Sequence, residues 1–208
     1  MKISNPLDRI LNSEIKVKIL RFLLKTEAQW NGRQIAKEIG ASPTTIHKAL
    51  QELERERVLI LHNIGKTHIY SLNQSHMLIT DMLKPLFERE EKILDGIISI
   101  IKQGVSSSAI KKDVLSVVLF GSVNTGSDHS ASDIDIAIVV DRLETRIKAE
   151  QLFDEIADKI SKVYGNVLSP YINTKAEFKA KHRDGMAVIR SILKSKKVIS
   201  GKSPENLL

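Results

Sequence analysis

The sequence predicts an α+β protein of two domains, in which a small helical domain precedes a mixed sheet with flanking helices. Two observations favour this. The first third of the chain has apolar residues at helical spacing, followed by two short extended stretches. The last half contains two apolar runs short enough for buried strands, one ending in Gly-Ser and one beginning with Asp-Ile-Asp. We expect domains at residues 1–75 and 105–208, joined by a helical segment at 76–104.

The composition indicates a globular protein with an anionic partner. Of the 208 residues, 42% are hydrophobic and 27% are charged, which is ordinary for a globular chain. The net charge is +7, and Lys and Arg exceed the acids by 12 to 7 over residues 1–75 and by 9 to 2 over residues 166–202. This excess favours nucleic acid, a nucleotide or an acidic protein, without choosing among them.

Several classes of protein are excluded or disfavoured. The absence of cysteine excludes disulfides and cysteine-ligated zinc or iron–sulfur sites. Asp8 and Arg9 lie where a signal peptide needs an unbroken apolar core, and no apolar run approaches the roughly 20 residues of a membrane span. We therefore expect a cytoplasmic protein without a membrane partner.

Three helices are predicted in the first third of the chain. The first covers residues 13–25 and starts at a serine that can cap it. The second covers residues 32–39 and ends at Gly40, because glycine adopts the left-handed conformation at little cost. The third covers residues 43–56 and starts with Ser42 followed by proline, a preferred helix start.

Two extended stretches follow the third helix. They cover residues 58–62 and 67–72 and are joined by a turn that contains Gly65, which predicts a β-hairpin. Three helices and a hairpin make a winged helix-turn-helix. Residues 34–72 resemble winged-helix transcription regulators, with Ile-Ala-Lys-Glu-Ile-Gly-Ala-Ser-Pro-Thr-Thr-Ile-His-Lys-Ala-Leu as the helix-turn-helix core.

The resemblance implies that the third helix enters the major groove of double-stranded DNA and that the hairpin contacts the backbone. The outer N-terminal half of this helix is polar. The candidate DNA-binding residues are Thr44, Thr45, His47, Lys48 and Gln51. The same module could instead mediate protein contacts or dimerisation, and the acidic far end of the helix keeps that alternative open.

Residues 76–103 predict a long, mostly helical stretch that is broken or kinked near Pro85. Its many apolar residues suggest a connector or the helix of a homodimer. A membrane-surface helix is disfavoured, because its acidic residues would meet anionic lipid. The glycine and serines of residues 104–108 predict a hinge before the second domain.

The first apolar strand of the second domain ends at a possible phosphate site. Residues 114–120 are mostly β-branched or apolar, and Gly121 and Ser122 follow them directly. Glycine lets the backbone approach an anion, and the serine hydroxyl and the amides after it can donate hydrogen bonds to phosphate oxygens. Alone this signal is weak, since Gly-Ser also ends many strands in ordinary turns.

Two aspartates in the second apolar strand supply the other half of the site. Residues 133–140 read Asp-Ile-Asp-Ile-Ala-Ile-Val-Val, which is the composition of a strand. Because side chains alternate along a strand, Asp133 and Asp135 project from the same face, about 6 to 7 Å apart at the backbone. Two carboxylates at this spacing can hold divalent cations between themselves and a triphosphate.

Leu-Phe-Gly-Ser, ten intervening residues and Asp-Ile-Asp-Ile resemble the signature of the polymerase β-like nucleotidyltransferases, especially the minimal ones. The resemblance implies that Gly121 and Ser122 bind a nucleoside triphosphate such as ATP. It also implies that Ser122, Asp133 and Asp135 are catalytic and that the two aspartates ligate Mg²⁺, with a two-metal site expected. An acceptor hydroxyl would attack the α-phosphate and release pyrophosphate.

The sequence departs from this family at a third carboxylate, which the family places on a later strand. There it helps to hold the catalytic metal and to activate the attacking hydroxyl. The candidate strand at residues 166–172 contains no acid, and Glu177 and Asp184 lie beyond it in expected helices. Binding of triphosphate and metal could survive this loss, whereas the transfer step loses one of the family's groups.

Two hypotheses follow. The first is a Mg²⁺-dependent nucleotidyltransferase that moves a nucleoside monophosphate onto an unknown acceptor and is localised or regulated by a DNA-binding module. Minimal nucleotidyltransferases also resemble antitoxin components, so a protein acceptor or a toxin partner is one possibility. The second hypothesis is a transcriptional regulator whose nucleotidyltransferase domain binds nucleotide without turnover.

Overall fold

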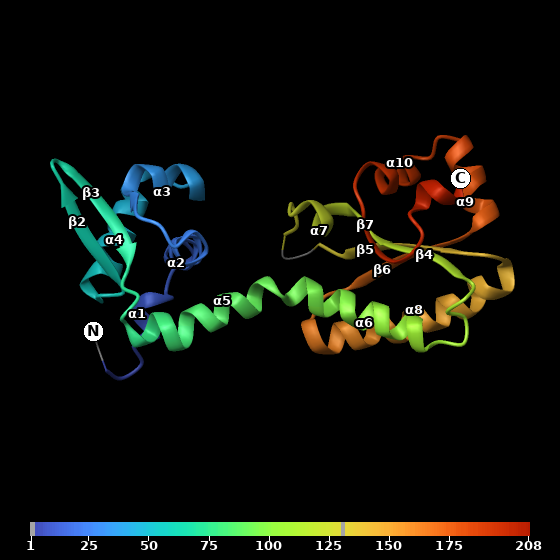
Figure 1. Cartoon of the computed structure of the whole chain (residues 1–208), viewed down its shortest axis with the longest axis horizontal. Helices are drawn as coiled ribbons and strands as arrows, with labels where there is room; N and C mark the ends of the chain where they lie inside the picture. The colour runs from blue at the N-terminus through green and yellow to red at the C-terminus, as the bar shows by residue number, and fades with distance from the viewer. Residues whose placement is uncertain (1–2, 130–131) are drawn as a thin grey trace. The chain divides into compact units, whose positions relative to one another are not determined.

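The computed structural model describes residues 3–129 and 132–208 and divides the chain into two compact units (Figure 1). Unit 1 spans residues 1–92 and unit 2 spans residues 93–208. Each unit buries its own apolar residues. Within the described ranges, no helix combines the length and the apolar character needed to cross a bilayer.

Unit 1 is a winged helix-turn-helix, as the sequence predicts. Its elements are α1 (Leu7–Ile10), α2 (Glu14–Thr26), β1 (Trp30–Asn31), α3 (Gly32–Ile39), α4 (Pro43–Arg55), β2 (Leu59–Ile64), β3 (Thr67–Leu72), the π-helical turn η1 (Leu78–Leu83) and α5 (Lys84–Glu91). Helices α2, α3 and α4 pack on one another, and the antiparallel sheet has the order β1-β3-β2.

Local signals fix where these helices start and end. The Ser42 hydroxyl accepts a hydrogen bond from the backbone N–H of Thr45, and Pro43 occupies the first turn of α4. Asn31 and Gln34 form a reciprocal capping box at the start of α3, and Gly40 ends that helix in the left-handed conformation.

A buried lysine joins the start of α2 to α4. Lys16 is only 3% exposed, and its Nζ donates to Arg9 O at 2.7 Å and to Asn12 Oδ1 at 2.9 Å. It also lies 2.7 Å from the carboxylate of Glu52 on α4, and the hydrogen bond from Lys16 is the main cause that lowers the pKa of Glu52. Burial of this charge is tolerated because three acceptors surround it.

Unit 2 is a four-stranded mixed sheet with helices on both faces. Its elements are α6 (Ile93–Ser107), β4 (Val114–Leu119), α7 (Gly121–Thr125), β5 (Ile134–Val140), α8 (Leu143–Tyr164), β6 (Leu168–Thr174), α9 (Lys175–Arg183), α10 (Ala187–Lys194), β7 (Lys197–Gly201) and the 3₁₀ turn η2 (Pro204–Leu207). The strand order is β6-β5-β4-β7; β6 is parallel to β5, and the other pairs are antiparallel.

Both faces of this sheet are buried, which explains why β4 and β5 are almost continuously apolar. Ile134, Ile136 and Ile138 pack against α6 and α8. Ala137 and Val139 face the other way, toward α9 and α10. Figure 1 shows these two helical pairs on opposite sides of the sheet. Asp135 has the parity of Ala137, so its carboxylate lies on the α9 and α10 face.

The predicted hinge at residues 104–108 is wrong. Helix α6 continues to Ser107, and Gly104 lies where it packs closely on α8, because a Cβ at that position would come within 2.7 Å of Ile156 Cδ1. The helical stretch is interrupted instead at Lys92, between α5 and α6. Near Pro85 the helical stretch changes character as predicted, because the π-helical turn η1 ends at Leu83 and Pro85 lies in the first turn of α5.

Part of the apolar residues that suggested a homodimer helix pack within their own unit. Ile97, Ile98 and Ile101 of α6 are buried in the core of unit 2. Phe87 of α5 is buried in the core of unit 1. Leu86 and Ile93 are 51% and 45% exposed, so packing within each unit accounts for only part of this apolar content, and the homodimer stays a prediction.

We expect Lys16→Met to lower the free energy of unfolding of unit 1 by about 2 kcal/mol, because three acceptors lose their donor. Lys18→Met is the matched control, since its ion pair with Glu14 is exposed and screened by solvent, so its loss should change the free energy of unfolding far less. Urea unfolding can be followed by the fluorescence of Trp30, the sole tryptophan of the chain. Equal effects of the two changes would contradict the role given to Lys16.

Candidate active site and nucleic-acid interface

The Gly-Ser turn lies directly against the second aspartate. β4 ends at Leu119, Phe120 is extended, and Gly121 begins α7 with φ +75°. A Cβ on Gly121 would overlap Asp135 Oδ2 and lie 3.1 Å from its carboxyl carbon. The backbone N–H of Phe120 donates to Asp135 O at 3.0 Å. Only glycine meets both demands, a left-handed backbone and close approach to a carboxylate.

The two predicted metal ligands differ in environment. Asp135 lies in β5 and is half-buried, whereas Asp133 precedes the strand and is exposed. Burial, and secondarily the negative charge of Asp133, raise the pKa of the Asp135 carboxyl. The two carboxylates therefore repel one another, and a bound cation would relieve that repulsion. Oxygen donors of this kind suit Mg²⁺.

Ser122 lies in the first turn of α7 and is half-buried. Its carbonyl accepts hydrogen bonds from Thr125 Oγ1 at 3.0 Å and from the backbone N–H of Ser127 at 3.1 Å, so these residues close the end of α7. Asn124 Nδ2 donates to Ser195 Oγ at 2.9 Å, which ties α7 to the segment before β7. The turn is thus held at both ends. Residues 130 and 131 of the predicted polar loop lie outside the described ranges.

The strand next to Asp135 offers no third carboxylate. In the parallel register of β5 and β6, Asp135 pairs with Ser169 and Ala137 pairs with Tyr171, so Ser169 and Tyr171 share the face of the aspartate. Within the described residues, no cluster of three or more His, Asp or Glu side chains is arranged to hold a metal ion. The β6 residue that pairs with Asp135 is therefore Ser169, whose side chain is a hydroxyl and not a carboxylate.

Glu177 is the first acidic residue after β6 in the sequence, and its carboxylate is engaged in other hydrogen bonds. It accepts from the backbone N–H of Thr174 at 2.8 Å and from Arg146 Nη1 at 2.7 Å. The Thr174 hydrogen bond, and then the charge of Arg146, lower its pKa. Thr174 lies five residues beyond Ser169, or about 16 Å along the strand. Glu177 caps α9 at the opposite end of the strand from Asp135.

Comparisons with known protein families identify both halves of the chain. Residues 16–66 match the helix-turn-helix family described as HTH domain. Residues 103–205 match the family described as Polymerase beta, Nucleotidyltransferase. The chain therefore combines a helix-turn-helix domain with a nucleotidyltransferase domain. Its C-terminal part carries a domain that matches the polymerase β nucleotidyltransferase model.

Solved structures with similarity to the chain include HlyU from Vibrio cholerae, with 18% identity, 42% of this chain and 87% of that chain covered, and a TM-score of 0.35. NolR from Sinorhizobium fredii is 19% identical; the match covers 41% of this chain and 82% of that chain, with a TM-score of 0.36. A toxin–antitoxin structure with AMP-PNP is 18% identical; the match covers 52% of this chain and 77% of that chain, with a TM-score of 0.32. No curated protein matches the chain.

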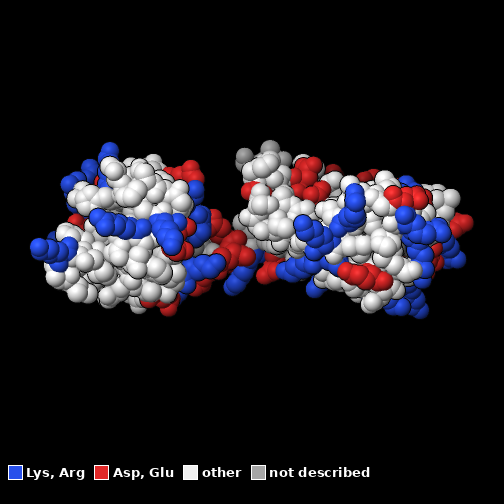
Figure 2. Space-filling model, turned by 90° about the horizontal axis from the view of Figure 1, so that it is seen from above, with Lys and Arg blue, Asp and Glu red and all other residues white. Residues whose placement is uncertain are grey.

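The five residues predicted to bind DNA all lie exposed on α4. Four of them share one face of the helix, because they lie three, four and seven residues after the first; these are Thr44, His47, Lys48 and Gln51. The fifth, Thr45, has its hydroxyl 2.7 Å from Ser42 Oγ and takes part in the cap of α4. Figure 2 shows basic side chains spread over the visible face of unit 1.

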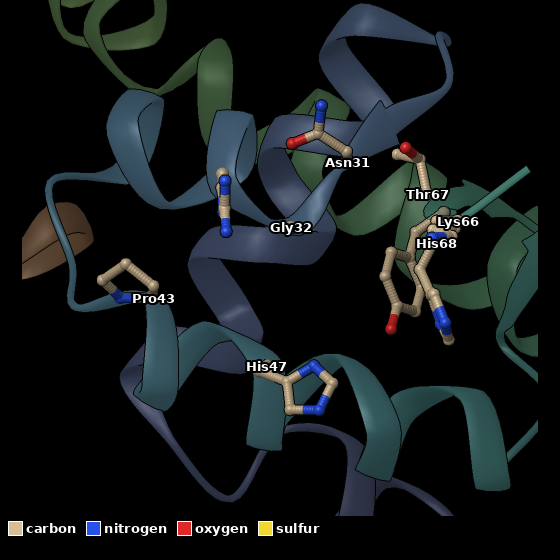
Figure 3. Close-up of a pocket in the computed structure, with 9 residues that line it drawn as sticks. Asn31, Gly32, Pro43, His47, Lys66, Thr67 and His68 are labelled. Carbon is tan, nitrogen blue, oxygen red and sulfur yellow. The ribbon is translucent and has the colours of Figure 1, made fainter.

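A groove of about 530 Å³ in unit 1 adds residues that the sequence interpretation missed (Figure 3). His47 enters it from α4. The residues contributed by α3, by the hairpin turn and by β3 are Arg33, Lys66, Thr67, His68 and Tyr70. A signal was present in the sequence, since Lys66 and His68 flank the tip of the hairpin, but their convergence with His47 depends on packing.

We expect Gly121→Ala to destabilise unit 2 by at least about 1 kcal/mol more than Gly126→Ala does. Both glycines have positive φ, but a Cβ at Gly126 meets nothing within 4 Å, whereas one at Gly121 overlaps the Asp135 carboxylate. Urea unfolding followed by far-ultraviolet circular dichroism measures the difference. When Asp135 is also replaced by alanine, the additional destabilisation by Gly121→Ala should become smaller. If it stays the same, the clash with the Asp135 carboxylate is not its cause.

Proposed function

We propose that the chain is a Mg²⁺-dependent nucleotidyltransferase that moves a nucleoside monophosphate from a nucleoside triphosphate to an acceptor hydroxyl, and that unit 1 binds double-stranded DNA. One observation carries the catalytic half. In a domain of the polymerase β nucleotidyltransferase family, the paired carboxylates of Asp133 and Asp135 lie beside the Gly121 turn. The pair supplies oxygen donors for Mg²⁺, which the proposed reaction requires.

The chain's own residues have distinct tasks in this proposal. The Gly121 backbone and the Ser122 hydroxyl bind and orient the triphosphate. Asp133 and Asp135 would hold Mg²⁺, in a two-metal arrangement when nucleotide completes the coordination. When bound, the metal neutralises charge on the attacking and leaving oxygens. The acceptor hydroxyl loses its proton to water and its oxygen forms a bond to the α-phosphorus. The bond from the α-phosphorus to the oxygen that bridges to the β-phosphate breaks, and that oxygen leaves with pyrophosphate.

A second candidate function is a nucleotide-responsive regulator without turnover. The observation that favours it is Ser169, which occupies the position beside Asp135 on the neighbouring strand where a third acid could lie. A hydroxyl there neither adds charge to hold a catalytic metal nor activates an acceptor as a carboxylate can. The regulator would retain nucleotide and metal binding and would pass the signal to DNA binding by unit 1.

Pyrophosphate release decides between the two functions. With Mg²⁺, each of the four ribonucleoside triphosphates and cell extract as the acceptor source, we expect the purified chain to release pyrophosphate. Asp133→Ala and Asp135→Ala should each lower the rate by at least about 100-fold, because each removes a metal ligand. The matched control is Asp158→Asn, which changes an exposed aspartate of α8 paired with Lys162.

The outcomes separate cleanly. Release that depends on both site aspartates and not on Asp158 supports the transferase. Nucleotide binding by calorimetry, lost in Asp135→Ala but without pyrophosphate release from any triphosphate, supports the regulator. Absence of both binding and release would overturn both functions of the site.

For unit 1 we expect Lys48→Ala to weaken binding to a mixed-sequence DNA duplex and to reduce the slope of log affinity against log salt by about one, because one phosphate contact is lost. Lys102→Ala on α6 is a control of equal charge change on an exposed lysine of unit 2. Fluorescence anisotropy over a salt series measures both. An unchanged slope for Lys48→Ala would remove α4 from the DNA interface.

A further inference from the structure

A lysine lies in the same row of the unit 2 sheet as Asp135. Phe120 directly follows β4 and donates its backbone N–H to Asp135 O at 3.0 Å. On the other side of β4, Leu119 pairs with Lys197 of β7 in an antiparallel register. Lys196 therefore lies beside Phe120, and two strand spacings, or about 10 Å, separate its backbone from that of Asp135. The residue between them directly precedes the Gly-Ser turn.

The segment that carries Lys196 is tied to this turn. Asn124 Nδ2 of α7 donates to Ser195 Oγ at 2.9 Å, and Ser195 is the residue before Lys196. Figure 1 shows α7 and the start of β7 at the same end of the sheet. A triphosphate bound at the start of α7 would therefore lie close to Lys196.

The ammonium group of Lys196 lies on the same face of the sheet as the Asp135 carboxylate. Its Nζ donates to Leu193 O of α10 at 2.9 Å, and α10 covers the face from which Asp135 projects. Lys197 points the other way, since its Nζ lies 3.6 Å from the carboxylate of Asp95 on α6. The two adjacent lysines thus serve opposite faces, as strand alternation requires.

The second acceptor of Lys196 is a carboxylate that water can replace. The Lys196 side chain is only 14% exposed, and it pairs with Glu205 of η2. The hydrogen bond from Lys196, and then that from the Ser203 hydroxyl, lower the pKa of Glu205 to about 2. The Glu205 side chain is 48% exposed, whereas Leu207 anchors η2 in the core. Glu205 can therefore leave the lysine while the turn stays in place.

We propose that Lys196 is a triphosphate-binding residue of the unit 2 site, and that Glu205 occupies it when nucleotide is absent. This rests on the proposed binding of a nucleoside triphosphate at the Gly-Ser turn. An ammonium group has three N–H donors, so Lys196 can keep its hydrogen bond to Leu193 O while it exchanges Glu205 for a phosphate oxygen. The lysine supplies positive charge from the chain itself, which the two aspartates of the site lack.

The position of Lys196 assigns it to one end of the triphosphate. In the proposed reaction the α-phosphate reacts beside the carboxylates of Asp133 and Asp135. Lys196 lies across Phe120 from Asp135, so it contacts the phosphates that leave as pyrophosphate. A charge-assisted hydrogen bond of this kind strengthens binding about tenfold.

The first test uses calorimetry with excess Mg²⁺ and no acceptor, on the full chain and the ribonucleoside triphosphate that it binds most tightly. Lys196→Gln should weaken binding about tenfold, and Lys196→Arg should weaken it less because the charge is kept. Lys197→Gln is the matched control; it removes the adjacent lysine on the other face and should leave the affinity unchanged. The monophosphate of the same base, which has no leaving phosphates, should bind Lys196→Gln and the wild type equally.

The second test distinguishes a nucleotide-binding lysine from an ion pair that only supports the fold. Glu205→Gln removes the carboxylate that competes for Lys196, so triphosphate binding should become about threefold stronger. When Lys196 is also replaced by glutamine, the Glu205→Gln change should lose this effect. If the pair only supports the fold, each single change weakens binding, and the two effects have the same sign.

Three results would overturn the inference while leaving the proposed function intact. They are triphosphate binding that is unchanged in Lys196→Gln, binding that falls in Glu205→Gln, and an equal loss of monophosphate and triphosphate in Lys196→Gln. A wild type that binds no triphosphate overturns the proposed nucleotide site and the inference with it. Thermal melts verify folding of each variant; if Lys196→Gln unfolds, the opposite effects of Lys196→Arg and Glu205→Gln decide.

Discussion

The candidate active site depends on the close approach of the Gly121 backbone to the Asp135 carboxylate. This contact places the turn after β4 against the carboxylate side of β5, and the Phe120–Asp135 backbone hydrogen bond holds the two strands in register there. A side chain at residue 121 would have to displace either the turn or the carboxylate. Because β4 and β5 are central strands buried on both faces, neither displacement is inexpensive.

The same contact explains why the site is electrostatically unfavourable without a cation. Asp135 is partly removed from water by the turn that packs on it, and Asp133 adds a second negative charge on the same face. Repulsion within this pair opposes folding, whereas the surrounding strands are stabilised by backbone hydrogen bonds and apolar packing. An arrangement that costs stability and serves no packing role is typical of a binding or catalytic site.

Much of this could be predicted from the sequence because the relevant signals are local. Caps, a turn glycine and strand alternation specify the helices of unit 1, the Gly-Ser turn and the shared face of Asp133 and Asp135. What escaped prediction depends on packing between distant segments. Gly104 reads as a hinge until α8 is known to lie against it. Ser169 becomes the neighbour of Asp135 only through the β5–β6 register, and His68 lines the same groove as His47 only through the fold of the hairpin.

The two units offer phosphate two opposite kinds of site. The groove of unit 1 is lined by the cations of Arg33 and Lys66 and by no acidic residue, so its side chains could contact a phosphate directly. The site of unit 2 carries carboxylates, which would repel a triphosphate unless a divalent cation offsets their charge. The proposed function therefore requires a divalent cation at the second site and none at the first.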